Sequence, residues 1–123
     1  GEIFKKESVE RRVKECGLSN YCTFIKGDCR ETIPDFLKNY SDSMVSKNSI
    51  KISILYIDCN AYEPAIASMY NFYDHMTNNS IIAIDEKLQG AETEALIDFA
   101  KEKNLKVEQL GPNSVPMMAR IKK

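Results

Sequence analysis

The chain has 123 residues, of which 43% are hydrophobic, so it is long enough and apolar enough for one globular domain. Its 17 basic and 18 acidic residues leave a net charge of −1, and no apolar run approaches the ~20 residues that span a bilayer, which argues against nucleic acid or a membrane as a partner. The four cysteines have no C-x-x-C spacing and the N-terminus has no signal-peptide pattern, so we expect free thiols, no zinc site and a cytoplasmic protein.

The first third of the chain predicts two helices separated by a strand. A helix over Ser8–Cys16 carries one modest apolar stripe and is stopped by Gly17. The segment Tyr21–Lys26 has a strand pattern, and a second helix should run over Thr32–Tyr40, with its first residue as the cap. The polar stretch Ser41–Ser49 is typical of a surface loop.

The middle of the chain gives the strongest signals. Lys51–Ile57 is a nearly continuous apolar run, which is the pattern of a strand covered on both faces. Glu63 and Pro64 then open a helix, since both residue types are favourable in a first helical turn. The apolar positions that follow the helical period are Ile66, Met69, Tyr70, Tyr73 and Met76.

The last third predicts a strand, a helix and a hairpin. Ser80–Ile84 is a second strand of the buried type, and Ala91–Lys103 is a helix closed by Asn104. Leu105–Leu110 and Val115–Ile121 both have strand patterns, and the short connection between them cannot hold a crossover helix. These two strands should therefore be antiparallel neighbours. The helix should point Ala95, Leu96, Phe99 and Ala100 at the core.

Acidic side chains follow two of the predicted strands, at the point where each strand ends. Asp58 comes directly after the first buried strand, and Asp85 and Glu86 come after the second. Open α/β sheets bind their ligands at this end of the strands, so the three carboxylates could meet at one edge. Hard oxygen ligands of this kind suit Mg²⁺, which keeps several waters and takes its remaining ligands from a substrate.

Four short segments, taken in order, point to a known family. They are Phe24–Asp28, Glu31–Pro34, Tyr56–Pro64 and Ile84–Glu86. Together with the order of three βα units and a terminal hairpin, they resemble the C-terminal part of a class I S-adenosylmethionine-dependent methyltransferase. The order and spacing of the segments are similar to those of the macrocin O-methyltransferase family, which methylates sugar hydroxyls in a metal-dependent way.

The resemblance implies a Rossmann-like α/β sheet that is flanked by helices and ends in an antiparallel β-hairpin, as one partial methyltransferase-like domain over residues 1–123. Family members begin with further strands and a glycine-rich cofactor turn, whereas the five glycines of this chain form no G-x-G motif. We therefore expect the chain to be the C-terminal two-thirds of a longer protein and to be inactive alone. A gap in its sheet should lead either to direct pairing of Tyr21–Lys26 with Lys51–Ile57 or to a homo-oligomer through the exposed edges.

The resemblance also implies the function and its residues. The reaction would be S-adenosylmethionine-dependent, Mg²⁺-assisted O-methylation of a sugar or another hydroxylated small molecule. Asp58 would be the general base and would bind the metal together with Asp85 and Glu86. Asp28 and Cys29 would lie around the adenine ring of the cofactor.

Each of these roles has a plainer structural alternative. Asp58 and Asp85 could cap the turns that follow their strands, and Glu86 could be an exposed loop charge. Asp28 after Gly27 is equally typical of a turn.

The function has alternatives in other classes as well. Cys59 and Asn60 stand where the family has Gly and Asp, and Glu86 stands where it has Asp, which fits a degenerate, non-catalytic binding domain. A phosphoacceptor domain of the response-regulator type also gathers strand-end carboxylates around Mg²⁺. That class has neither the terminal hairpin nor the helix start at Tyr62–Pro64, so the sequence argues against it.

Overall fold

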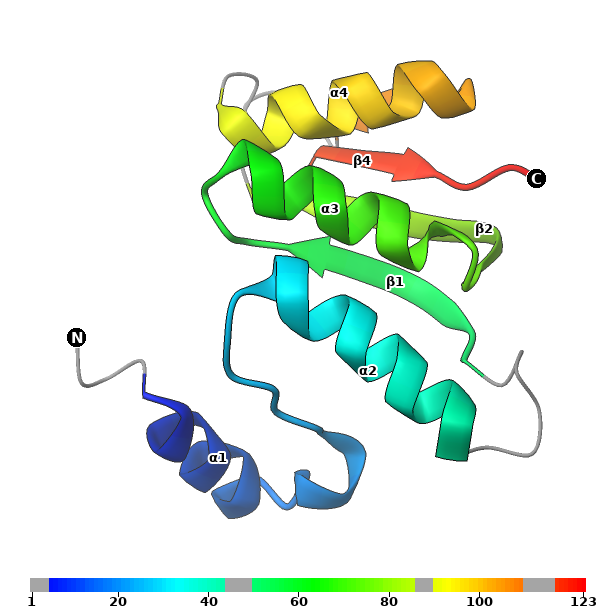
Figure 1. The fold of residues 1–123 in the computed structure, drawn as a ribbon. Coiled ribbons are helices and arrows are strands. Elements are labelled where there is room, and N and C mark those ends of the chain that lie inside the picture. The colour runs from blue at the N-terminus through cyan, green and yellow to red at the C-terminus, as the bar shows by residue number, and fades with distance from the viewer. Residues whose placement is uncertain (1–4, 44–49, 86–89, 110–116) are drawn as a thin grey trace.

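The computed structural model describes residues 5–43, 50–85, 90–109 and 117–123. These residues form four α-helices, one short 3-10 helix and a four-stranded sheet (Figure 1). Within these ranges no helix is long and apolar enough to cross a membrane. All four cysteines carry free thiols, as the sequence predicts.

The sheet is mixed, with the strand order β1-β2-β4-β3. β1 (Ile52–Ile57) and β2 (Met76–Ile84) run parallel. β4 (Met117–Arg120) lies between β2 and β3 (Val107–Gln109) and is antiparallel to both. The predicted antiparallel pairing of the last two strands is therefore confirmed, and the structure adds that the last strand is inserted into the sheet.

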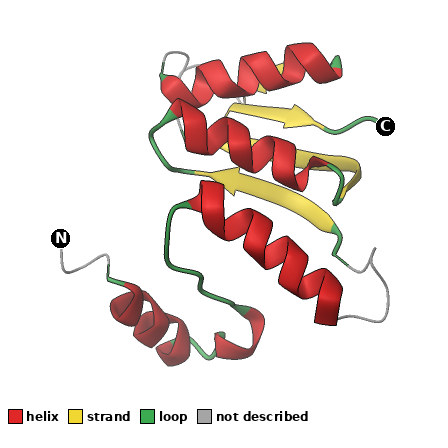
Figure 2. Ribbon diagram, viewed as in Figure 1, coloured by secondary structure: helices red, strands yellow, loops and turns green. Residues whose placement is uncertain are grey.

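Two helices cover one face of this sheet (Figure 2). α3 (Tyr62–Tyr73) and α4 (Ala91–Lys103) lie side by side over the strands, and α2 (Cys29–Ser43) packs against α3 beyond β1. α1 (Lys6–Glu15) lies apart from the sheet and contacts the short 3-10 helix η2 (Ser19–Tyr21). The N-terminal elements thus extend away from the layer that carries the core.

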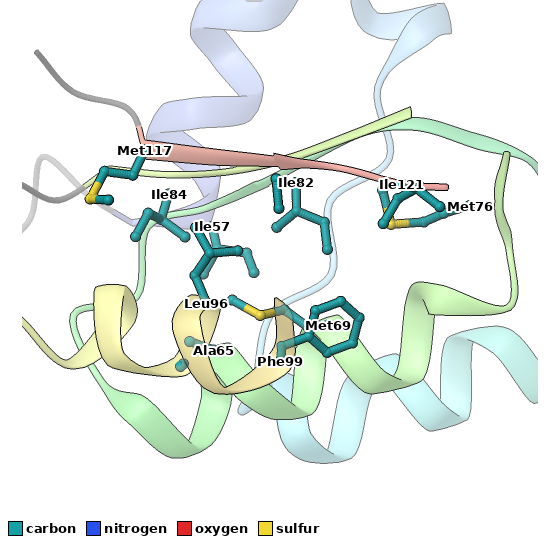
Figure 3. Packing of buried hydrophobic residues seen from close by; sticks show 12 residues of the cluster. Ile57, Ala65, Met69, Met76, Ile82, Ile84, Leu96, Phe99, Met117 and Ile121 are labelled. Carbon is teal, nitrogen blue, oxygen red and sulfur yellow. The ribbon is translucent and has the colours of Figure 1, made fainter. Parts of the chain in front are cut away.

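The hydrophobic core lies between the sheet and the helix pair α3 and α4 (Figure 3). Ile57 of β1 lies opposite Ile84 of β2, and both side chains are buried in this core. From α4, Phe99 fills the centre at 0% exposure, with Tyr70 and Tyr73 of α3 packed edge-on against its ring at centroid distances of 5.2 and 5.6 Å. The four positions of α4 that the sequence predicts to face inward are all buried: Ala95, Leu96, Phe99 and Ala100.

The structure confirms the predicted end of α4 but not that of α3. Asn104 ends α4 in the left-handed conformation, with φ of 57°, as its place after the last apolar position predicts. α3 ends earlier than the sequence indicates, at Tyr73, and Met76 is the first residue of β2 rather than part of the helix. Met76 is nevertheless buried in the same core, because the turn returns the chain to the sheet within three residues.

The prediction of a strand over Tyr21–Lys26 is wrong. Tyr21 ends η2, its side chain is 84% exposed, and the residues after it form no ladder with any strand in the described part of the chain. A β-strand is stable only beside a partner, and the apolar pattern alone does not supply one. Direct pairing of this segment with β1 is therefore not found.

The second helix is longer than predicted at both ends. α2 begins at Cys29 because Asp28, and not Thr32, caps it: the Asp28 Oδ1 accepts the backbone N–H of Arg30 at 2.9 Å. The helix continues to Ser43, so the first part of the loop predicted for Ser41–Ser49 is helical. The rest of that loop lies outside the described residues.

The prediction that β1 is covered on both faces is wrong. Ile57 is buried, but Ile54 and Tyr56 point to the opposite face and are 66% and 54% exposed. β1 is also the outermost strand on one side of the described sheet, so one of its two edges has no partner among these strands. The apolar run therefore reflects an exposed face as well as the core.

We propose that the isolated chain self-associates through the open edge and exposed face of β1, because such an edge is a template for pairing with another strand. Lysines at Ile54 and Tyr56 should raise the dissociation constant of the oligomer at least about tenfold, because each places a charge on the contact. Sedimentation velocity of the double variant and of Ile97→Lys, a control on the outer side of α4, would measure the effect. A wild-type chain that stays monomeric at its highest soluble concentration would contradict the proposal.

Candidate functional site

The candidate site lies where β1 and β2 end. The two strands are parallel and Ile57 pairs with Ile84, so Asp58 and Asp85 follow in step at the same edge of the sheet. The backbone N–H of Asp85 donates to the Ile57 carbonyl at 3.0 Å and extends the ladder by one bond. Both aspartate side chains are exposed, so two carboxylates are available to a ligand at this edge.

The hydroxyl of Tyr56 lies near the negative charges of this edge. The pKa of its hydroxyl is raised by partial burial, then by a hydrogen bond with the Asp85 carboxyl group, and further by the negative charges of Asp85, Asp58 and Glu92. A phenol resists ionisation near negative charge, and these causes place the charges of Asp85, Asp58 and Glu92 near the Tyr56 hydroxyl. The predicted grouping of Asp58, Asp85 and Glu86 around a metal ion stays a prediction.

The predicted metal site is only partly represented in the structure. Glu86, the third predicted ligand, lies outside the described residues. Among the residues that are described, no three His, Cys, Asp or Glu side chains come close enough together to hold an ion. Two exposed carboxylates at one strand edge still fit Mg²⁺, which usually binds one or two protein carboxylates and keeps waters and substrate oxygens as its other ligands.

The loop after β1 is held by a residue that the sequence did not single out. Glu92, in the first turn of α4, is 0% exposed, and its Oε1 accepts the backbone N–H groups of Cys59 and Asn60 at 2.5 Å each. Asn60 adopts the left-handed conformation, with φ of 55°. An acidic residue in a first helical turn usually lies at the surface, so the sequence gives no signal that this one is buried.

Cys59 follows Asp58 in this loop but is poorly suited to act as a nucleophile. Burial is the largest cause that raises the pKa of its thiol, and the negative charge of Glu92 raises it further, while the Ala61 backbone opposes the shift. A thiol with a raised pKa forms little thiolate at neutral pH. Cys29 is a further group that raises this pKa, so the start of α2 lies near the same loop.

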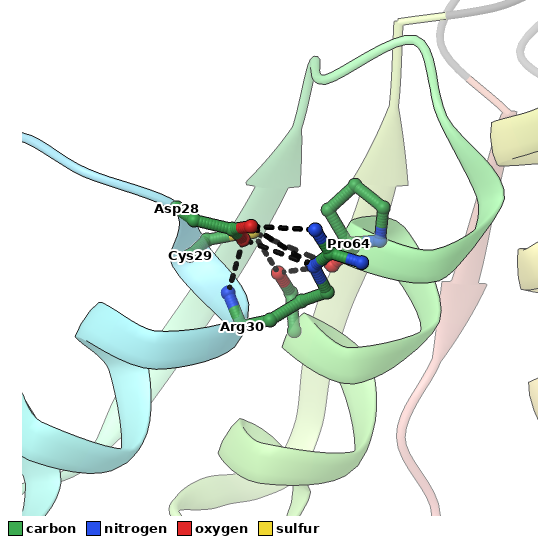
Figure 4. A network of polar contacts seen from close by, with 5 residues as sticks. Asp28, Cys29, Arg30 and Pro64 are labelled. Carbon is green, nitrogen blue, oxygen red and sulfur yellow. Dashed lines mark hydrogen bonds and ion pairs between the residues drawn. The ribbon is translucent and has the colours of Figure 1, made fainter.

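The predicted cofactor residues Asp28 and Cys29 lie at the start of α2, against the start of α3 (Figure 4). The Arg30 guanidinium bonds both carboxylate oxygens of Asp28, at 2.6 to 3.1 Å, and together with the Arg30 backbone N–H it lowers the pKa of Asp28 to about 2. The Cys29 thiol is half-buried and points to the Pro64 carbonyl at 3.7 Å. The capping role of Asp28 is thus observed, and its role towards a cofactor stays a prediction.

Comparison with known proteins gives matches in structure. No family model and no curated protein matches the chain. A structure of CalS11, described as a TDP-rhamnose 3'-O-methyltransferase of calicheamicin biosynthesis, matches 94% of the chain with 25% identity and a TM-score of 0.66. A second CalS11 structure, at 23% identity and a TM-score of 0.64, also matches 94% of the chain, and the O-methyltransferase NovP matches 97% at 14% identity and a TM-score of 0.71. The chain spans 48%, 44% and 46% of these structures, respectively.

Proposed function

We propose that this chain, which has the Rossmann-like fold of a class I methyltransferase, forms part of an S-adenosylmethionine-dependent enzyme that O-methylates a sugar. The observation that carries the proposal is the match of 94% of the chain, at 25% identity, to an enzyme described as a sugar O-methyltransferase. The two exposed carboxylates at the ends of β1 and β2 support it, since open α/β sheets bind ligands at that edge.

In this proposal the protein positions a hydroxyl group and removes its proton. S-adenosylmethionine would supply an electrophilic methyl group. Asp58 would accept the proton of the sugar hydroxyl while the hydroxyl oxygen bonds to the methyl carbon and the carbon–sulfur bond breaks, with S-adenosylhomocysteine as the leaving group. Asp58 suits this role because it is an exposed carboxylate at the end of β1. Most of the rate gain would come from holding the hydroxyl in line for transfer.

Assistance by Mg²⁺ belongs to the same proposal. Asp58 and Asp85 would hold the ion, with Glu86 as a further ligand, and the ion would lower the pKa of the sugar hydroxyl. The support is the pairing of Ile57 with Ile84, which brings the two aspartates to one edge. Asp28 and Cys29 would contact the adenine ring, and their place beside the start of α3 supports that role. A cytoplasmic location is part of the same proposal, and the four free thiols are its support.

The alternative is a methyltransferase-like domain that binds a ligand or a protein without catalysis. The specific observation in its favour is Asn60, an amide where the family motif has a carboxylate, in a backbone conformation fixed by Glu92. An amide side chain cannot take a proton from a hydroxyl, so this position offers no second base.

Calorimetric titration with S-adenosylhomocysteine, with and without Mg²⁺, tests the proposal on this chain and on the longest natural form of the protein that contains it. We expect the longest form to bind, because the fold of its neighbours includes a second half that this chain does not span. The binding form would then be assayed for transfer of labelled methyl groups to TDP-rhamnose as the first acceptor. Binding by neither form would reject the enzyme and favour the non-catalytic domain.

A further inference from the structure

Glu92 is a charged residue in a place where charge is costly. It is the second residue of α4, and its side chain is 0% exposed. A buried carboxylate is stable only when hydrogen bonds and local dipoles replace the lost water. The N-terminal end of α4 supplies a favourable dipole for the negative charge.

The hydrogen bonds of Glu92 lie in the candidate site. Its Oε1 accepts the N–H groups of two successive residues, Cys59 and Asn60, at 2.5 Å each. Bonds from backbone N–H groups to an ionised oxygen are among the stronger ones in proteins. They join residues that are 33 and 32 positions apart in the chain, so α4 fixes the turn that follows β1.

The turn that Glu92 holds is also the turn that sets the direction of Asp58. Two amide groups directed into the protein leave little freedom to the peptide that links Asp58 to Cys59. Asn60 has φ of 55°, a conformation that most non-glycine residues avoid and that Asn tolerates. The contacts with Glu92 thus stabilise the backbone path on which Asn60 adopts this conformation.

We infer that Glu92 is a positioning residue, which keeps the carboxylate of Asp58 beside Asp85 by holding the backbone of Cys59 and Asn60. It is not a catalytic residue, since its side chain is buried and its Oε1 is occupied by the loop. The part of this inference that concerns catalysis rests on the proposed role of Asp58. The part that concerns the loop does not.

Amide hydrogen exchange measured by NMR on this chain tests the loop directly. Glu92→Leu should speed exchange at Cys59 and Asn60 at least about tenfold, because it removes the acceptor. Glu92→Gln should speed exchange less, since an amide oxygen of the same reach remains as an acceptor. This variant replaces Glu92→Leu in the test if the leucine variant does not fold. Glu94→Gln, an exposed neighbour on the same helix, should exchange like wild type. Wild-type exchange in Glu92→Leu would overturn the inference.

A second readout separates positioning from mere stability. In the active form of the protein, Glu92→Leu should lower kcat about tenfold to a hundredfold with KM nearly unchanged, and Glu92→Gln should recover part of the loss. Faster exchange with unchanged kcat would overturn the positioning role. If the wild type transfers no methyl group, the proposed function fails, and the inference is then decided by nuclear Overhauser contacts between Asp58 and Asp85. Their persistence in Glu92→Leu would overturn it, and their loss would support it.

Discussion

Replacing Asp58 with asparagine should lower methyl transfer by the proposed enzyme at least about a hundredfold, with little change in fold. The side chain is exposed at the end of β1, so the substitution removes no core contact. Asparagine has nearly the same shape but cannot accept the proton of the sugar hydroxyl, and it is a weaker ligand for Mg²⁺. Radiolabelled methyl transfer to TDP-rhamnose, with urea unfolding on the same samples, would measure both effects.

The matched control for this substitution is Asp74→Asn. Asp74 is equally exposed but follows the C-terminal end of α3, at the other end of the helix from the candidate site. We expect full activity from this variant. Undiminished methyl transfer by Asp58→Asn would remove Asp58 from the mechanism, and a loss in both variants would point to a general effect of charge.

Phe99→Ala should lower the free energy of unfolding by about 3 to 5 kcal/mol. The ring is 0% exposed and packs edge-on against Tyr70 and Tyr73, so its removal leaves a cavity between α3 and α4. Small domains have only about 5 to 15 kcal/mol of stability, and the variant should therefore be partly unfolded at 37 °C. Urea unfolding followed by far-UV circular dichroism would measure the loss.

The control for Phe99 lies two residues away on the same helix. Ile97 is about half-exposed, and Ile97→Ala should change the free energy of unfolding by about 0.5 kcal/mol or less. Equal urea midpoints for Phe99→Ala and the wild type would show that the core does not depend on this ring.

The parts of the fold that the sequence predicts well have local signals. The helix Ala91–Lys103 has both its apolar period and its closing residue, Asn104, within one short stretch, and its bounds are confirmed. The segment Tyr21–Lys26 has a strand pattern but depends on a distant partner, and no local signal reports whether that partner exists. The start of α2 was mistaken for a related reason, since Asp28 and Thr32 are both good caps and only the structure shows which one is used.

In the candidate site, too, some residues can be predicted from the sequence and others cannot. Asp58, Asp85 and Glu86 are predicted to meet because parallel strands end at one edge, and the register of Ile57 with Ile84 places the two aspartates at that edge. Glu92 was missed because its burial depends on the approach of the loop after β1 to a helix more than thirty residues later. Acidic side chains of this kind look like ordinary surface residues until the tertiary contact is known.

The insertion of β4 between β2 and β3 also has a consequence for how the chain folds during synthesis. β3 pairs only with β4 among the described strands, and the core includes Met117, Ala119 and Ile121, which are made after the other helices and strands that the structure describes. While the ribosome still holds these residues, β2 lacks one neighbour and β3 lacks its partner. Closing a sheet through its most recently made strand requires contacts of long sequence separation, which form slowly. Until that strand emerges, the nascent chain exposes an unpaired edge of β2 to chaperones and to other chains.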